Sequence, residues 1–289
     1  MSSKRIPRII LVMFLLPVLY LSPGPYLRRN LKARNLSRDP GLYNGTLWKD
    51  KTSVPPSLMA DNIDIVPFNC SSPCHALVNH KRKFILVKHA KTGGTTLVRE
   101  LLEPQLCDIL EKHRRNKKLT CERAGKVSPW VSLFSYDVSR RIRLWEEYLT
   151  VSLIRDPFSR ARSAFNYLNA EEYLTWEQFS INPTKLVDSV PDTLKPSVAA
   201  HIQPQCPCTF DPVSGEQFVN LLISSSSFNS GAALLIQMIN ERNPNLAPLK
   251  LTYEDRNVGK KKGWKITVDD YTNICRSYKM DLPYNLRQE

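Results

Sequence analysis

Two short segments of this chain combine residue types that can hold phosphate groups. The first follows a run of β-forming residues and brings together a lysine, two glycines and three threonines: Lys91, Thr92, Gly93, Gly94, Thr95 and Thr96. Glycine lets the backbone approach an anion closely, amide groups of a turn and of a following helix point toward it, and lysine adds positive charge. In the Walker loop the lysine follows the glycines, whereas here it precedes them. This order indicates a different nucleotide and a different transferred group.

The second segment repeats the plan of strand, loop and helix further along the chain. Arg155 follows the β-rich run 148–154, and Pro157 suits the first turn of a helix that also carries Ser163. Two parallel strands would bring both loops to one edge of a sheet, where open α/β sheets bind ligands. We therefore expect an α/β fold with a central parallel sheet flanked by helices.

Together the two segments resemble the motifs of the PAPS-dependent sulfotransferases of the Golgi carbohydrate type, where PAPS is 3′-phosphoadenylyl sulfate. The first is similar to their P-K-T-G-[GS]-T-[ST] loop, with Ala90 at the usual proline position, and the second matches R-D-P-x-x-R-x-x-S from Arg155 to Ser163. Residues 201–205 resemble an H-x-x-P-Q element of that group, and the segment from Tyr278 resembles its C-terminal ending. The resemblance implies a P-loop-like sulfotransferase fold in a single domain.

The resemblance also implies roles for the residues of both motifs. PAPS would be the co-substrate, and the motif demands no metal ion. Lys91 would act catalytically by neutralising charge on the bridging oxygen, and Arg155 and Ser163 would bind the 3′-phosphate. The remaining loop residues expected to hold the 5′-phosphosulfate are Thr92, Gly93, Gly94, Thr95 and Thr96. The expected acceptor is a hydroxyl of an anionic, glycosaminoglycan-like glycan.

The general base that takes the proton of the acceptor hydroxyl has more than one candidate. Histidine is best tuned for this step near neutral pH. His113 is the only histidine between the two motifs, and His201 opens the H-x-x-P-Q element, so we give both equal weight. The acidic alternatives are Glu111 and Asp137. Two other functions stay open: an inactive sulfotransferase-fold protein that binds polyanions, and a P-loop nucleotide kinase.

Composition and the N-terminus indicate a lumenal protein with anionic partners. The 289 residues suffice for one α/β domain, and the net charge of +14 favours nucleic acid, acidic lipid or glycan. An uncharged run, 9–21, follows basic residues and predicts a signal-anchor or a signal peptide. Three N-x-[ST] sequons, candidate glycosylation sites, come after it: Asn35, Asn44 and Asn69. With the family resemblance, we expect a single-pass type II Golgi membrane protein that has no nucleic-acid partner.

The expected organisation has four parts. They are a cytoplasmic tail at 1–8, the anchor at 9–21, a stem at 22–80 and the catalytic domain at 81–289. The basic stretch 105–127 is either a solvated face or one wall of a groove for the anionic glycan.

Seven cysteines fit an oxidising compartment and leave at least one unpaired. Cys70 and Cys74 could close a small loop. Cys206 and Cys208 could instead pair outward, with Cys107, Cys121 or Cys275.

Local patterns predict several further elements. Periodicity favours helices over 130–145, 217–223 and 232–242, and a late strand over 249–253. Thr267 is a plausible cap for a last helix that reaches Tyr278.

Overall fold

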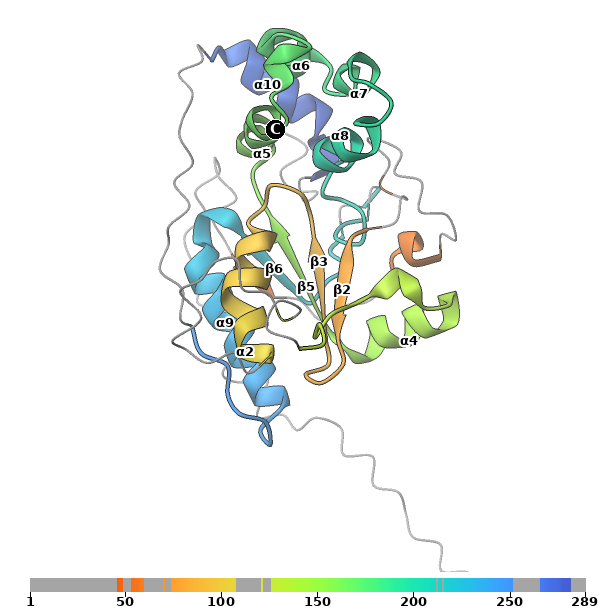
Figure 1. The fold of residues 1–289 in the computed structure, drawn as a ribbon, viewed down its shortest axis with the longest axis vertical. Helices are drawn as coiled ribbons and strands as arrows, with labels where there is room; N and C mark the ends of the chain where they lie inside the picture. The colour runs from red at the N-terminus through yellow and green to blue at the C-terminus, as the bar shows by residue number, and fades with distance from the viewer. Residues whose placement is uncertain are drawn as a thin grey trace, which may run out of the picture. The chain divides into compact units, whose positions relative to one another are not determined.

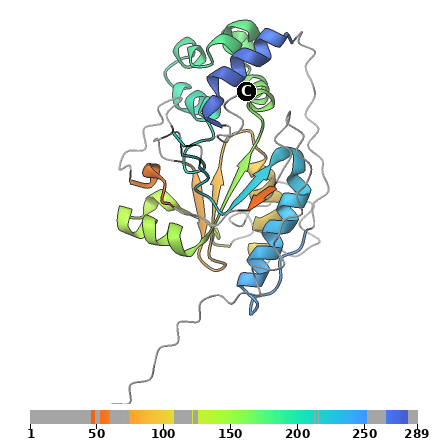
Figure 2. The same cartoon turned by 180° about the vertical axis from the view of Figure 1, so that it is seen from behind.

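The computed structural model describes the parts of the chain that carry its sheet and most of its helices. The described residues are 46–48, 53–59, 70, 74–107, 121, 126–211, 213–214, 216–251 and 266–281. They form a single mixed α/β domain, an open sheet flanked by helices (Figures 1 and 2). Within these ranges, no helix is long and apolar enough to cross a membrane. The expected cytoplasmic tail, the anchor and the three sequons lie outside the described residues.

Six described strands form one mixed sheet in the order β1-β6-β5-β3-β2-β4. Its centre is parallel and consists of β3 (Phe84–Lys88), β5 (Leu149–Ile154) and β6 (Leu221–Ser224). The outer strands pair antiparallel, and they are β1 (Thr46–Trp48), β2 (Ala76–Asn79) and β4 (Val131–Ser132). The expected parallel sheet is therefore limited to the middle three strands. A short turn joins β2 to β3, and so short a connection permits only antiparallel pairing.

Each face of the sheet is covered by a different set of elements. On one face, apolar side chains of the strands pack against η2 (Thr96–Leu102), α2 (Glu103–Leu106) and α9 (Phe228–Arg242). On the other face they pack against η1 (Pro56–Met59), η3 (Leu133–Ser135) and α4 (Val138–Glu147), together with residues from 206–219. The parallel strands β3, β5 and β6 are thus buried on both faces, which is why they read as nearly continuous apolar runs.

A separate helical layer lies beyond the carboxyl ends of the parallel strands (Figure 1). Its members share their own apolar cluster, in which aromatic side chains of several helices pack together. They are α5 (Pro157–Tyr167), η4 (Ala170–Glu172), α6 (Trp176–Ile181), α7 (Lys185–Ser189), α8 (Lys195–Ile202) and α10 (Val268–Ser277). The short η6 (Lys279–Asp281) continues from α10. Because α5 starts where β5 ends, this layer covers the edge at which the two motifs meet.

The side chains of β3 and β5 alternate between the two faces of the sheet. Phe84 and Leu86 contribute to one apolar cluster, whereas Ile85 and Val87 contribute to the other, as the two-residue period of a strand requires. In β5 the polar Thr150 lies on the face of the sheet that α4 covers. Its backbone N–H and its hydroxyl both donate to the side-chain oxygen of Asn220, at 2.9 and 3.0 Å. Buried polar groups of the strand are therefore hydrogen-bonded.

Several local predictions are confirmed. Helix α5 begins at Pro157, and the Asp156 side chain accepts from the Ser159 N–H as its cap. Helix α10 begins after Thr267, which forms a capping box with Asp270. Helix α9 contains the predicted helix 232–242.

Three local predictions are wrong. Leu221–Ser224 is strand β6 rather than part of a helix, because a short apolar run is ambiguous by itself and pairing with β5 decides it. The predicted helix 130–145 is divided into β4, η3 and α4. Residues 249–251 form no strand, and 252–253 lie outside the described residues.

The sheet and the disulfides extend into the range 22–80, where we expected a stem. Strands β1 and β2 belong to the sheet, so ordered structure begins before residue 81. Disulfides join Cys70 to Cys206 and Cys74 to Cys208, so the predicted Cys70–Cys74 loop is wrong. The third disulfide joins Cys107 to Cys121, and Cys275 is unpaired, so the predicted pairing of the 206–208 segment with one of these three cysteines is wrong. That one cysteine is left over agrees with the odd count. Three disulfides are compatible with a secreted or lumenal protein.

Candidate functional site

The candidate site lies at the carboxyl edge of the three parallel strands. Lys88 pairs with Leu153, and Ile154 pairs with Ser224, so β3, β5 and β6 end side by side. The glycine loop 89–95 follows β3, and Arg155 follows β5. Ligands of open α/β sheets bind at this edge, and the parallel pairing brings the two sequence motifs together as expected.

The glycine loop turns sharply into η2. Lys91 and Gly93 have φ angles of 65° and 97°, in the left-handed region that a non-glycine residue adopts only at a cost of about 1–2 kcal/mol. The buried Thr92 hydroxyl donates to the His89 carbonyl at 2.9 Å and ties the loop to itself. A Cβ at Gly94 would lie 2.6 Å from Cγ of Lys88, so only glycine leaves room for that lysine. The loop is therefore shaped by its own sequence.

Positively charged side chains gather at this loop, and none of them forms a salt bridge with a carboxylate of the described residues. Arg155 donates through Nη1 to the carbonyl of Lys91 at 3.3 Å, and burial together with Arg155 lowers the pKa of Lys91. Burial also lowers the pKa of Lys88, and Arg99 adds to the effect. Among the described residues, the salt bridges are Arg160–Asp281 and Lys195–Asp192, so Lys88, Lys91 and Arg155 take part in none of them. Mutually repelling cations at a sheet edge favour the binding of an anion.

Tyr167 links Lys91 to His201. The ammonium of Lys91 lies 3.9 Å from the centre of the Tyr167 ring, a cation–π contact, and the His201 ring stacks on Tyr167 with centroids 4.8 Å apart. Both groups therefore lie within 4.8 Å of the centre of one aromatic ring, which belongs to the end of α5.

His201 has the tautomer that a general base requires. Its Nδ1 lies 2.7 Å from the carbonyl of Ser197, which can only accept, so Nδ1 carries the proton and Nε2 keeps its lone pair. Burial lowers the pKa of His201 despite this hydrogen bond, and Lys91, Arg160 and Lys88 lower it further. The imidazole is therefore neutral near pH 7.

Gln205 holds the backbone of Arg155 in place. Its side-chain oxygen accepts from the Arg155 N–H at 2.7 Å, and its amide nitrogen donates to the Arg155 carbonyl at 2.8 Å. Asp281 in turn accepts from the Gln205 backbone N–H, and from its side-chain amide at 3.2 Å. Gln205 and Asp281 are both buried. We call Gln205 and its bonds to Arg155 and Asp281 the Gln205 clamp.

Arg160 completes the support of this clamp. It is 1% exposed, forms an ion pair with Asp281 at 3.4 Å and lies 4.7 Å from the Tyr278 ring centre. The Tyr278 hydroxyl donates to the carbonyl of Ile202 at 2.8 Å. Burial raises the pKa of Asp281, although Arg160 opposes the change. Three segments that are distant in sequence, 155–160, 201–205 and 278–281, thus form one buried unit.

His89 belongs to the interior rather than to the site surface. Its Nε2 lies 2.8 Å from the Thr209 hydroxyl, which lies 2.9 Å from the Ser152 hydroxyl. Burial lowers the pKa of His89 to about 3, so the ring is neutral throughout the physiological range. Its neutral imidazole connects β3 to the 206–211 segment.

The other predicted site residues differ in where they lie. Ser163 is half-buried on α5, Thr95 is exposed, and Thr96 is buried at the start of η2. Asp137 caps α4 by accepting from the Arg140 N–H at 2.9 Å. The predictions that lie outside the described residues concern His113, Glu111 and the sequons at Asn35, Asn44 and Asn69, together with most of the stretch 105–127.

Four residues of the site were not assigned a role from the sequence. Lys88 had a recognisable signal, because it is the only charged residue in an apolar strand. Gln205 and Asp281 lay in segments with family resemblance, but their hydrogen bonds depend on the fold. Tyr167 gave no signal, since its role arises from α5 packing beside α8.

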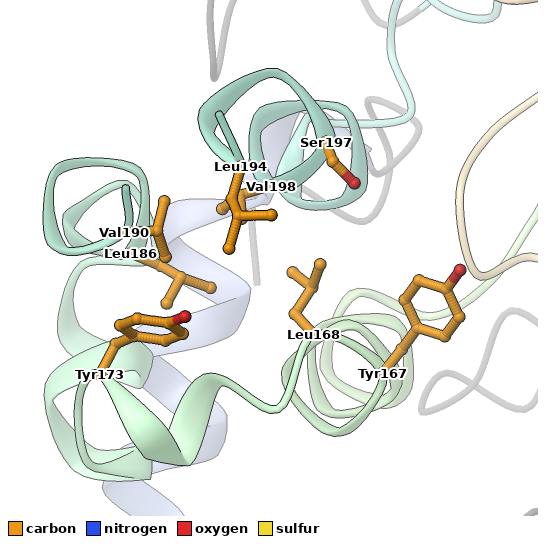
Figure 3. A pocket seen from close by; sticks show the side chains of 8 residues that line it. All are labelled: Tyr167, Leu168, Tyr173, Leu186, Val190, Leu194, Ser197 and Val198. Atoms are coloured by element: carbon orange, nitrogen blue, oxygen red, sulfur yellow. The ribbon is translucent and has the colours of Figure 1, made fainter. Parts of the chain in front are cut away.

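A cavity of about 230 Å³ opens beside Tyr167 among α5, η4, α7 and α8 (Figure 3). Tyr167 and Ser197 lie on one side of it, and Tyr173 lies on the other. Leucine and valine side chains make up the remaining lining: Leu168, Leu186, Val190, Leu194 and Val198. Among the described residues, no charged side chain is part of the lining. The cavity therefore differs in chemistry from the cationic loop next to it.

No family model, curated protein or solved structure matches this chain. The resemblance to carbohydrate sulfotransferases thus rests on the motifs of the sequence.

Proposed function

We propose that this protein is a PAPS-dependent carbohydrate O-sulfotransferase that works in the Golgi lumen as a membrane-anchored enzyme. The observation that carries the proposal is the group of cations formed by Lys88, Lys91 and Arg155 around a glycine loop at the carboxyl edge of parallel strands. Such a group attracts a ligand with several negative charges, and PAPS has phosphates at both ends of its ribose. The motif order supports PAPS over ATP.

The nucleotide would lie across both motifs. Backbone amides around Gly93 and Gly94, with Lys91, would hold the 5′-phosphosulfate. Arg155 and Ser163 would hold the 3′-phosphate, and the planar guanidinium suits that contact. The Gln205 clamp fixes the backbone from which the Arg155 side chain extends, so it limits the positions available to the guanidinium.

The transfer itself would use His201 and Lys91. The acceptor hydroxyl oxygen attacks sulfur in line with the bond to the 5′-phosphate oxygen, and Nε2 of His201 takes the hydroxyl proton. That sulfur–oxygen bond breaks, and its electron pair stays on the phosphate, which leaves as PAP. The ammonium of Lys91 stabilises the charge that develops there. His201 is favoured because it stacks on the same ring that Lys91 contacts.

A second candidate function is binding of an anionic glycan without turnover. The observation that favours it is the same positive charge, which forms no salt bridge within the described ranges and would hold a polyanion without any chemistry. The two functions differ in a simple assay. Salt-sensitive heparin binding by a protein that neither binds PAP nor transfers sulfate would establish the second function.

The deciding experiment measures transfer of labelled sulfate from PAPS by the full-length protein to a panel of desulfated glycosaminoglycans, together with PAP affinity by calorimetry. Lys91→Ala should lower turnover about 100- to 1,000-fold, because it removes the charge that stabilises the leaving group. Arg155→Ala should weaken PAP binding roughly tenfold or more, since a charged hydrogen bond is lost.

A matched control is Lys195→Ala, which removes an exposed lysine paired with Asp192 on the helical layer. It should change neither quantity. If the wild-type protein bound no PAP, the proposed function would be abandoned. Tight PAP binding without transfer to any acceptor would contradict the catalytic role and leave a nucleotide-binding protein.

A further inference from the structure

The cavity beside Tyr167 is lined by residues that also contact Lys91 and His201, the two proposed catalytic residues. Tyr167 lines the cavity, and its ring also receives the Lys91 ammonium and the stacked His201. Ser197 lines the cavity too, and its carbonyl accepts from Nδ1 of His201. A molecule in the cavity would therefore lie next to the groups that activate a hydroxyl and stabilise the leaving phosphate.

The lining of the cavity favours an uncharged ligand with an apolar face. Tyr173 presents an aromatic ring, and the aliphatic side chains around it include Leu186, Val190 and Val198 (Figure 3). A carboxylate or sulfate that contacts only this lining loses its hydration without gaining a partner there, which is costly. The C–H face of a sugar ring loses little by comparison, and the lining residues with a hydroxyl group are Tyr167, Tyr173 and Ser197. The volume of about 230 Å³ suits a single sugar ring.

We propose that this cavity is an acceptor subsite that binds an uncharged sugar unit and selects against a uronic acid at that position. The inference rests on the proposed sulfotransferase function and adds the chemical class of the unit held next to the reacting hydroxyl. Negative charges elsewhere on the acceptor would contact the basic surface outside this cavity. The positive net charge of the protein would by itself favour a uronic acid, so the cavity predicts the opposite preference.

The first test compares two ligands that differ only at C6: methyl β-D-glucopyranoside and its uronic acid, methyl β-D-glucopyranosiduronate. Binding of each to the full-length protein is measured by ligand-observed NMR, with and without PAP. The neutral glycoside should bind at least about tenfold more tightly than the uronate, because the carboxylate would be buried unpaired. Equal binding, or tighter binding of the uronate, would overturn the subsite.

A pair of matched variants links the binding to the cavity. Leu194 lines it and is 42% exposed, whereas Ile181 on α6 is 59% exposed and is not part of the lining. Leu194→Asp should weaken the neutral glycoside about tenfold or more, since it places a charge in the apolar lining. Ile181→Asp should leave that affinity unchanged. Both exposed positions tolerate a polar side chain, so folding should be preserved, and unchanged PAP affinity would verify it.

The outcomes separate this proposal from the one it rests on. Binding of PAP and sulfate transfer with no effect of Leu194→Asp on acceptor affinity would overturn the subsite and keep the sulfotransferase. Binding of the neutral glycoside that Leu194→Asp removes, in a protein that binds no PAP, would overturn the sulfotransferase and keep the sugar site.

Discussion

At the scale of single residues, the site is a group of cations. Burial and neighbouring positive charges lower the pKa of Lys88 and Lys91. Lys91 is the centre of this arrangement, because its backbone is left-handed, its carbonyl accepts from Arg155 and its ammonium contacts Tyr167. The same positive charge disfavours a second proton on His201. In the proposed reaction, the lysine that would stabilise the anionic leaving group would thus also keep a nearby imidazole ready to accept a proton.

This coupling predicts the pH dependence of the reaction. The pKa of His201 is lowered from its usual 6.5, and a base works only when it is deprotonated, so activity should rise with pH and level off. The acid limb of kcat/KM for PAPS should therefore lie below pH 6.5. His201→Gln should remove this limb and lower turnover about 100-fold or more.

The control is His75→Gln, which changes a histidine placed before β2 and should leave the acid limb in place. An unchanged limb and full turnover in His201→Gln would assign the base to another residue, and His113 would be tested next.

At the scale of elements, the site depends on three segments that meet behind Arg155. The start of α5, the end of α8 with the residues that follow it, and η6 supply Arg160, Gln205 and Asp281. Removing one partner of a buried ion pair or hydrogen-bonded group leaves the others unsatisfied, which is costly. These elements therefore position the backbone of Arg155 without supplying a side chain that is proposed to contact PAPS.

Gln205→Ala tests this positioning role. It leaves the N–H and carbonyl of Arg155 without their side-chain partner, so PAP affinity should fall about tenfold. Gln217→Ala is a matched control, because it also removes a buried glutamine that donates to a backbone carbonyl, that of Val219 at 2.8 Å. Calorimetry with PAP and thermal unfolding are measured for both variants.

The two glutamine variants should lose similar stability, but only Gln205→Ala should lose PAP affinity. A purely structural role for Gln205 would instead leave PAP affinity unchanged while stability fell.

At the scale of the whole molecule, two disulfides join the segment before β2 to the segment that carries the Gln205 clamp. Cys70 and Cys74 both precede β2, and their partners Cys206 and Cys208 are the sequence neighbours of Gln205 and Thr209. Thr209 in turn contacts His89, directly before the glycine loop. Both motif loops are therefore connected to the same cross-linked region.

Removing one of these disulfides should affect both stability and nucleotide binding. The double variant Cys70→Ser/Cys206→Ser opens only a short ring, because Cys74–Cys208 still joins the same two segments, and should cost roughly 2 kcal/mol of unfolding free energy. PAP affinity should also fall, because the bond lies next to Gln205. Urea unfolding and PAP calorimetry measure the two effects.

The matched control is Cys107→Ser/Cys121→Ser, which opens a link of only 14 positions at the end of α2 away from the glycine loop. It should cost a similar amount of stability, because both variants open a short ring, and leave PAP affinity unchanged. Equal loss of PAP affinity in both variants would contradict the proposed connection.

The sequence by itself determined the features that depend on neighbouring residues. The strand–glycine loop–helix pattern after Phe84, the Arg155–Asp156–Pro157 start of α5 and the Thr267 cap are local, because turn geometry, capping and strand burial act within a few residues. These patterns also placed Lys91 and Arg155 at one sheet edge.

Only the tertiary structure decided the features that depend on distant segments. Strand β6 exists because it pairs with β5, and the cysteines pair as they do because 70–74 lies beside 206–208. The Gln205 clamp and the Lys91–Tyr167–His201 contact likewise join segments far apart in sequence. Local propensity holds no information on such pairs, because their energy exists only after the chain has folded and brought them together.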